Sequence, residues 1–169
     1  SELNDKVLEL IIIDSFTLNA FAVPGGVIGI NAGLFIHAET EEEFASVIAH
    51  ELAHLRQRHY ARSVQTSTTN TALTLAGMLA SIVVAATAGS DAGIAALAST
   101  QALSAQSTLG YSRQNEQEAD RIGITTLYKT GMNPQAMPMM FHRMLEYKRY
   151  QGQLPEYLST HPLTENRVA

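Results

Sequence analysis

The sequence contains no cysteine, and this absence excludes disulfide bonds, thiolate metal sites and a cysteine nucleophile. Charged residues are also scarce, at 16% of 169 residues against about 25% in a typical domain. Basic residues are fewer than acidic ones, 11 against 16, and the net charge is −5. This deficit argues against a nucleic-acid-binding surface, which needs a basic stripe. The apolar share of 46% is ordinary, so we expect one folded hydrophobic core.

One long segment has almost no charge. Between Ser63 and Ser112 only Asp91 is charged, and small residues and leucine dominate. The segment predicts two small-residue helices, at about 71–88 and 92–109, with a break between them. The first helix approaches the length of a membrane span, but hydroxyl side chains dilute its apolarity. We therefore expect an inserted hairpin that is buried or touches a membrane, within a single domain of residues 1–169. The alternatives are a true membrane span and a mobile loop.

The N-terminal part of the sequence predicts β structure followed by a helix. Residues 7–37 are rich in β-branched side chains, and Pro24-Gly25-Gly26 is typical of a hairpin turn. The helix is expected over 41–59. Thr40 and Glu43 have the spacing of a capping box, which marks its start.

This helix carries the motif His50-Glu51-x-x-His54. His50 and His54 are four residues apart and leave the same face, which suits two nitrogen ligands on one tetrahedral Zn²⁺. Glu51 suits the general base of a metallopeptidase. The alternative from this segment alone is an amphipathic helix with two partly exposed histidines.

A second helix, expected over 113–129, carries Glu116 and Asp120, again four apart on one face. One carboxylate can bind zinc while the other accepts the ring N–H of a ligand histidine. The alternative is a solvated acidic face paired with neighbouring arginines. Downstream, Asn133-Pro134 predicts the start of a Met-rich helix, and residues 154–169 are predicted to be loop.

The motifs together resemble the gluzincin peptidases of the CAAX prenyl protease and HtpX heat-shock protease type. The similarity is greatest to the soluble bacterial branch of the beta-barrel assembly-enhancing protease. Beside the histidine motif, it rests on three segments, which are Asn19-Ala20-Phe21-Ala22-x-Pro24-Gly25-Gly26, Asn115-Glu116-x-Glu118-Ala119-Asp120-Arg121 and Thr160-His161-Pro162-x-x-x-x-Arg167. The resemblance implies an α+β fold, a mainly helical zincin-type metallopeptidase domain with a small β-sheet and an active-site edge strand.

The resemblance also implies the site. It makes His50, His54 and Glu116 the ligands of one Zn²⁺ per chain, and Glu51 the catalytic base. Asp120 matches an acid that hydrogen-bonds to a ligand histidine. The edge strand to which a polypeptide substrate adds by backbone pairing is expected at Gly29, Ile30, Asn31, Ala32 and Gly33.

Two C-terminal residues have alternative interpretations. His161 either donates a hydrogen bond to the oxyanion during hydrolysis or occupies the fourth zinc position and holds the enzyme off; a surface histidine is the third interpretation. Arg167 either orients a carboxylate near the site or forms a terminal salt bridge. No partner pattern accompanies three other histidines, which are predicted to be ordinary, namely His37, His59 and His142. Five tyrosines are candidate oxyanion donors, namely Tyr111, Tyr128, Tyr147, Tyr150 and Tyr157.

The predicted function is a zinc-dependent endopeptidase that hydrolyses internal peptide bonds of protein or misfolded-polypeptide substrates in cell-envelope quality control. The alternative is a chaperone-like envelope assembly or binding factor with a structural or latent zinc site. The resemblance implies a bacterial envelope location, in the periplasm, with a membrane or outer-membrane assembly partner contacted through 63–112. It leaves open whether the full-length protein has a signal peptide and a C-terminal repeat domain.

Overall fold

The structure, a computed structural model, describes residues 8–164 and Arg167. The chain divides into two compact units, one formed by residues up to Tyr60 and from Asn115 onward, the other by Ala61–Gln114. The uncharged segment lies within the second unit. The assignment of residues 1–169 to a single peptidase domain stays a prediction.

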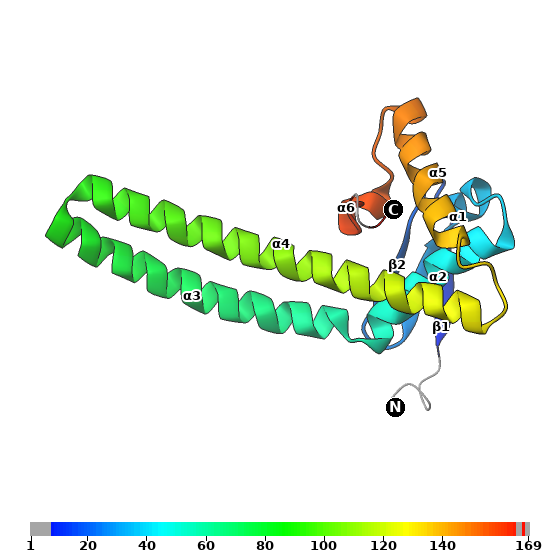
Figure 1. The fold of residues 1–169 in the computed structure, drawn as a ribbon, viewed down its shortest axis with the longest axis horizontal. Coiled ribbons are helices and arrows are strands. Elements are labelled where there is room, and N and C mark those ends of the chain that lie inside the picture. Colours follow the sequence, from blue (N-terminus) through cyan, green and yellow to red (C-terminus); the bar gives the residue numbers. More distant parts are fainter. Residues whose placement is uncertain (1–7, 165–166, 168–169) are drawn as a thin grey trace. The chain divides into compact units, whose positions relative to one another are not determined.

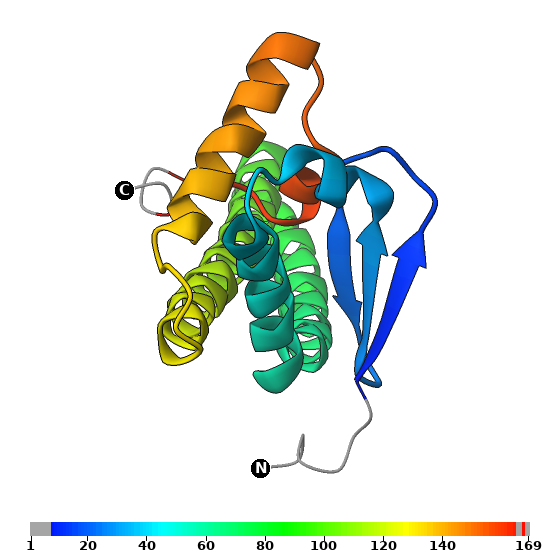
Figure 2. The ribbon, with the colours of Figure 1, turned by 90° about the vertical axis from the view of Figure 1, so that its right-hand side faces the viewer.

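The first unit contains a three-stranded sheet in the order β1-β3-β2 (Figure 2). β2 (Ala20–Val23) and β3 (Val27–Asn31) form an antiparallel hairpin, as predicted, while β1 (Glu9–Ile13) pairs in parallel with β3. Gly25 and Gly26 have φ values of 108° and 90° in the hairpin turn. Only glycine adopts such angles readily, which explains the Pro-Gly-Gly sequence.

The expected edge strand at 29–33 is wrong in two respects. β3 is paired on both sides, so Gly29, Ile30 and Asn31 lie in the central strand, and the edges are β1 and β2. Ala32 and Gly33 begin a short helix, α1 (Ala32–His37). A Cβ at Gly33 would lie 2.3 Å from the carbonyl oxygen of Phe16, so this glycine lets α1 pass close to the preceding loop.

α2 (Glu41–Arg56) starts at the predicted residue, because Thr40 Oγ1 accepts a hydrogen bond from the Glu43 N–H at 3.1 Å. The Glu43 carboxylate reaches back and accepts from the Glu39 N–H at 2.7 Å. α2 ends three residues before the predicted end. Arg58 follows with a φ of 53°, a left-handed conformation that turns the chain into the next helix.

The next two helices are longer than predicted. α3 (His59–Ala88) and α4 (Ser90–Lys129) are joined at Gly89, which has a φ of 98° (Figure 1). The separate helices expected at 92–109 and 113–129 are one 40-residue helix. No proline lies between them, and a single Gly110 is too weak a breaker to end a helix.

Two helices complete the first unit. α5 (Ala136–Gln151) is the expected Met-rich helix and ends at Gly152, which has a φ of 66°. The tail contains a short helix, α6 (Glu156–Thr160), where a loop was predicted.

The core of the first unit lies between the sheet, α2, α4 and α5. Its fully buried large side chains are Leu18, Ile28, Leu34, Val47, Leu127, Met137, Met140, Met144 and Tyr157. Close helix packing also depends on Gly123 in α4. A Cβ there would lie 2.6 Å from Met137 Cε and 3.3 Å from the backbone nitrogen of His50. The glycine therefore lets α4 approach α2 beside the histidine motif.

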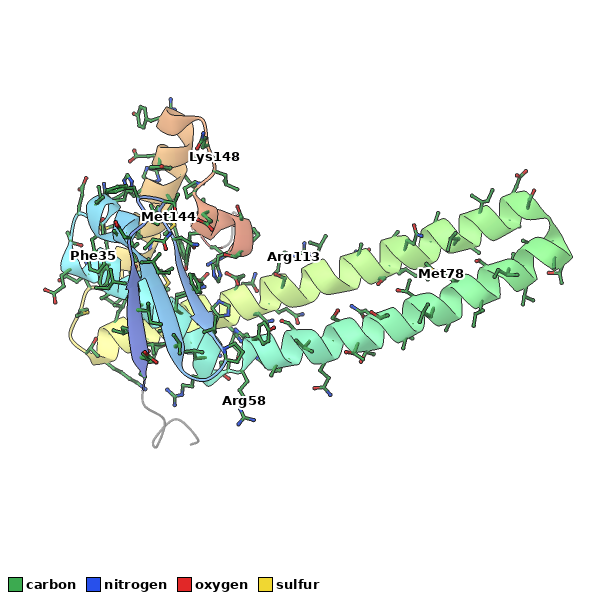
Figure 3. The ribbon with its side chains drawn as sticks, turned by 180° about the vertical axis from the view of Figure 1, so that it is seen from behind. Phe35, Arg58, Met78, Arg113, Met144 and Lys148 are labelled. Atoms are coloured by element: carbon green, nitrogen blue, oxygen red, sulfur yellow. The ribbon has the colours of Figure 1, made fainter. Side chains whose placement is uncertain are left out.

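The second unit, considered by itself, is the hairpin of α3 and α4, in which small and hydroxyl side chains lie between the helices. A Cβ at Gly77 would lie 2.3 Å from Thr100 Cγ2, and one at Gly93 would lie 2.4 Å from Ala85 Cβ. Thr74 Oγ1 donates to Ser104 Oγ at 3.0 Å. Large apolar side chains face outward along both helices (Figure 3), and six of them are at least 63% exposed, namely Leu73, Leu79, Ile82, Val83, Ile94 and Leu103.

We predict that Arg143→Leu destabilises the first unit by roughly 2 kcal/mol at pH 7, because it leaves the buried Glu43 carboxylate without its cation. Burial raises the pKa of Glu43, but hydrogen bonds from Arg143 and from the Glu39 backbone outweigh it and lower the pKa below 4.5. A lowered pKa stabilises the fold above that value and loses this effect as the pH falls. Without Arg143 the pKa rises instead, so the deficit of the variant shrinks from pH 7 toward pH 4.

Urea unfolding of the chelator-treated protein at both pH values measures this deficit. Arg149→Leu, an exposed change on the same helix, is the matched control. A deficit no larger than that of the control, or equal at both pH values, would contradict the assignment.

Candidate metal centre

The four-residue spacings on α2 and α4 bring two histidines and two carboxylates together. His50 Nε2 lies 2.9 Å from His54 Nε2 and 3.4 Å from Glu116 Oε2. His54 Nε2 lies 3.3 Å from Glu116 Oε1. All three predicted ligands therefore turn their donor atoms toward one point between the two helices.

The loop after α6 adds a fourth donor. His161 Nδ1 lies 3.0 and 3.1 Å from the two oxygens of Glu116 and 3.4 Å from His50 Nε2. The side chain is buried, and its ring stacks on Tyr157 at a centroid distance of 4.6 Å. The interpretation of His161 as a surface histidine is therefore wrong.

Asp120 holds the other nitrogen of His50. The His50 Nδ1–H donates to Asp120 Oδ1 at 2.8 Å, which turns Nε2 toward the ligand group. Arg167 donates to both oxygens of Asp120, at 2.6 and 2.9 Å, and its Nη1 lies 2.9 Å from Glu116 Oε2. Of the two interpretations of Arg167, the structure favours the one in which it orients a carboxylate at the site.

Glu51 lies beside the ligand group and is 1% exposed. Its Oε1 has no hydrogen-bond partner among the described residues and lies 3.5 Å from His161 Nε2. The backbone of Ala22 in β2 lowers the pKa of this carboxylate, against the larger effect of burial. A buried carboxylate oxygen without a partner is costly unless a ligand or water completes its shell.

The buried charges shift the pKa values of His50 and Glu116 in opposite directions. Burial alone would lower the pKa of His50, but hydrogen bonds to Asp120 and Glu116 outweigh it and raise the pKa to about 9. Burial would raise the pKa of Glu116, but hydrogen bonds from His161, His50 and His54 lower it far below its ordinary value. Glu116 is therefore an anion in the folded chain.

Burial dominates at two other residues of the site. It lowers the pKa of His54, which favours the neutral imidazole that a metal ligand must be. It also raises the pKa of Glu51, which makes that carboxylate a stronger base.

The donor set fits a divalent metal. Ligand atoms of His50, His54, Glu116 and His161 lie within 4.8 Å of one another. Two imidazoles and a carboxylate are a typical catalytic zinc set, and the buried Oε1 of Glu51 needs a hydrogen-bond donor such as a bound water.

Comparison with known proteins assigns the chain to a family. The model of peptidase family M48 matches residues 2–169. The chain belongs to this family.

Named relatives of this M48 chain include two bacterial proteins called beta-barrel assembly-enhancing protease. The one from Escherichia coli K12 is 44% identical over 158 residues, and the one from Yersinia pestis is 40% identical over 158 residues. Each alignment covers 94% of this chain and 32% of the relative. The mitochondrial metalloendopeptidase OMA1 of Schizosaccharomyces pombe is 32% identical over 168 residues, which cover 99% of this chain and 47% of OMA1. The chain thus spans about a third of the length of the bacterial relatives.

Sequence reasoning missed His59 in this M48 site. The prediction of an ordinary surface or interfacial histidine is wrong, because His59 is 3% exposed and its Nδ1 lies 2.8 Å from His54 Nδ1. The contact depends on the left-handed turn at Arg58, which no motif signals.

Of the candidate tyrosines, the structure brings Tyr157 to the site. Tyr157 is buried against His161, and its hydroxyl has no hydrogen-bond partner among the described residues. Tyr128 and Tyr150 are at least 74% exposed, and Tyr147 packs edge-on against His37. The side chain of Tyr111 lies outside the described part of the chain.

Proposed function

We propose that this M48 chain is a zinc-dependent endopeptidase that hydrolyses internal peptide bonds of polypeptides. The observation that carries the proposal is the buried group of His50, His54 and Glu116 with the partnerless carboxylate oxygen of Glu51 beside it. A purely structural zinc site has no use for a general base at its edge. The geometry therefore supports the enzyme over the alternative of a binding factor with a structural zinc.

The chemistry is divided between the metal and the chain. When bound by the two histidines and Glu116, Zn²⁺ supplies polarisation of the scissile carbonyl and a lower pKa for the attacking water. Glu51 takes a proton from that water as the water oxygen bonds to the carbonyl carbon. As the C–N bond breaks, Glu51 passes the proton to the leaving amine. Asp120 and Arg167 hold the orientation of His50 and the charge of Glu116 throughout.

The edge of β2 suits an extended substrate. Asn31 N–H donates to the Asn19 carbonyl at 3.0 Å, so alternation along the antiparallel pair turns the backbone groups of Ala20 and Ala22 away from β3. The Ala22 backbone, which lowers the pKa of Glu51, is on this outward side. A polypeptide that adds to β2 by backbone pairing therefore passes the catalytic base, and such pairing selects few side chains.

His161 serves as the fourth donor in the resting site. Its ring lies within the ligand group, is held by the stacked Tyr157, and contacts Glu116 at 3.0 Å. A catalytic zinc keeps one position open, whereas four protein donors close it. This arrangement supports the plug over the oxyanion donor.

The hairpin of the second unit contacts a membrane in the bacterial cell envelope, at its periplasmic side. Among the helices in the described part of the chain, α3 alone is long and apolar enough to cross a membrane. At 1.5 Å per residue its 30 residues extend about 45 Å, against about 30 Å of hydrocarbon. Small residues inside and large apolar residues outside are the packing pattern of helices surrounded by lipid. The names of the bacterial relatives fit an envelope role in quality control of assembling or misfolded proteins.

We predict that Glu51→Gln retains about one zinc per chain and loses about 10²- to 10⁴-fold in cleavage of fluorescently labelled casein, because the proton acceptor is gone. Glu116→Ala loses the metal as well, because the ligand set is broken. Elemental analysis beside the cleavage assay measures both, with the exposed change Glu146→Gln as the control. Wild-type cleavage by Glu51→Gln would overturn the mechanism, and a folded, unchelated wild-type chain without zinc would overturn the site.

For His161→Ala, we expect retained zinc and several-fold faster casein cleavage, since three ligands remain and the fourth position opens. His142→Ala, which changes an exposed histidine, is the control. A large loss of cleavage with zinc retained would instead assign His161 to the oxyanion.

The hairpin assignment predicts that the chain sediments with vesicles of phosphatidylethanolamine and phosphatidylglycerol. Ile82→Asp should reduce the bound fraction at least tenfold, because an aspartate costs about 3 kcal/mol in hydrocarbon. Ile36→Asp on α1 is the matched control, as the two isoleucines are 65% and 60% exposed. Sedimentation unaffected by Ile82→Asp, or no binding of wild type to protein-free vesicles, would exclude lipid as the partner.

A further inference from the structure

His59 lies at the start of α3, behind the predicted zinc ligand His54. Its Nδ1 is 2.8 Å from His54 Nδ1, and its Nε2 is 3.3 Å from Glu118 Oε2 on α4. The ring is 3% exposed. The three side chains therefore form a continuous line from the ligand group to a carboxylate that lies outside it.

The local backbone places His59 there. α2 ends at Arg56, and Arg58 adopts the left-handed conformation in the turn marked in Figure 3. A non-glycine residue in this conformation is uncommon and stores strain, which the surrounding structure must balance. The turn brings His59 back onto the last turn of α2, where His54 lies.

The proton positions along this line follow from the role of His54. A ligating Nε2 must carry a lone pair, so the neutral imidazole of His54 has its proton on Nδ1. That N–H donates to His59 Nδ1, which must therefore accept. The remaining proton of a neutral His59 is on Nε2, from which it donates to Glu118.

The two histidine ligands thus differ in how they are held. His50 donates directly to the carboxylate of Asp120 at 2.8 Å, whereas His54 reaches Glu118 only through His59. Partners of this kind fix the tautomer and the ring orientation of a ligand histidine, and their loss typically costs about 10- to 100-fold in metal affinity.

We propose that His59 and Glu118 are positioning residues that fix the tautomer and the ring of His54 for metal binding. The proposal rests on the zinc site of the proposed function, and it adds two residues outside the histidine-glutamate motif to that site. Neither residue touches the substrate, and both act through His54.

The test measures zinc affinity by competition with a chromophoric chelator. We expect His59→Leu to weaken zinc binding about 10- to 100-fold. His59→Asn should recover most of this loss, because its side-chain oxygen can accept in place of Nδ1. Glu118→Gln should cause a smaller loss, because the amide oxygen still accepts from His59 but without the charge. The matched controls are His142→Leu and Glu146→Gln, which change an exposed His–Glu pair at 3.7 Å.

A second readout separates positioning from general stability. In the Co²⁺-loaded chain, the ring N–H protons of ligand histidines give shifted, exchangeable proton NMR signals. The signal of the His54 Nδ1–H should disappear by exchange in His59→Leu and persist in His59→Asn, while that of the His50 Nδ1–H persists in both. A purely structural role would change the two signals together or neither.

Wild-type affinity and both N–H signals in His59→Leu would overturn the proposal and leave the zinc site intact. If His59→Leu does not fold, unchanged affinity in Glu118→Gln together with loss of the His54 signal in His59→Asn overturns it. A wild-type chain that binds neither Zn²⁺ nor Co²⁺ would overturn the proposed function itself, and with it this inference.

Discussion

The hydrogen bond between His50 and Asp120 connects the two helices on which the site depends. It joins α2 to α4 at 2.8 Å inside the core, where both side chains are out of water. Buried carboxylates are costly unless they are paired, and Asp120 is paired twice, with His50 and with Nε and Nη2 of Arg167. The same arginine reaches Glu116, so one cation from the C-terminal segment pairs with both α4 acids of the site, Glu116 and Asp120. Loss of this arrangement would leave uncompensated charge at the centre of the fold.

Periodicity predicted the site where the side chains lie on a single helix. The four-residue spacings of His50 with His54 and of Glu116 with Asp120 are local facts, and the structure brings both pairs together. Periodicity does not predict which segments far apart in the sequence pair with one another. β3 is central only because β1 adds in parallel on its far side, and a strand sequence does not state how many neighbours it has. The position of His59 depends on one left-handed residue, Arg58, where the sequence shows neither glycine nor asparagine.

The two units bury opposite kinds of side chain. In the first unit, leucine, isoleucine and methionine fill the interior, as in ordinary globular domains. In the hairpin, glycine, alanine and hydroxyl side chains fill the interface. The hydroxyl groups donate hydrogen bonds to backbone carbonyls one helical turn earlier, as those of Thr74 and Thr100 do. Such an interface gains little from the hydrophobic effect in water. The low charge of the sequence is therefore concentrated in the part of the chain whose outer surface is the least suited to water.

The C-terminal segment carries both the cation that pairs with the buried acids and the proposed plug, His161, and this limits how the site can open. Arg167 binds Asp120 and also donates to the Pro162 carbonyl at 3.0 Å, while Tyr157 is anchored in the core and donates its backbone N–H to Leu18. Withdrawal of the whole segment would remove the cation from two buried acids and empty the place of a large core side chain. His161 lies between these two anchors, so a change confined to its own side-chain torsions, with loss of the Tyr157 stacking, withdraws the proposed fourth donor at much lower cost. With His161 in the proposed role of plug, the site opens by movement of this one imidazole, and the segment that carries it remains in place.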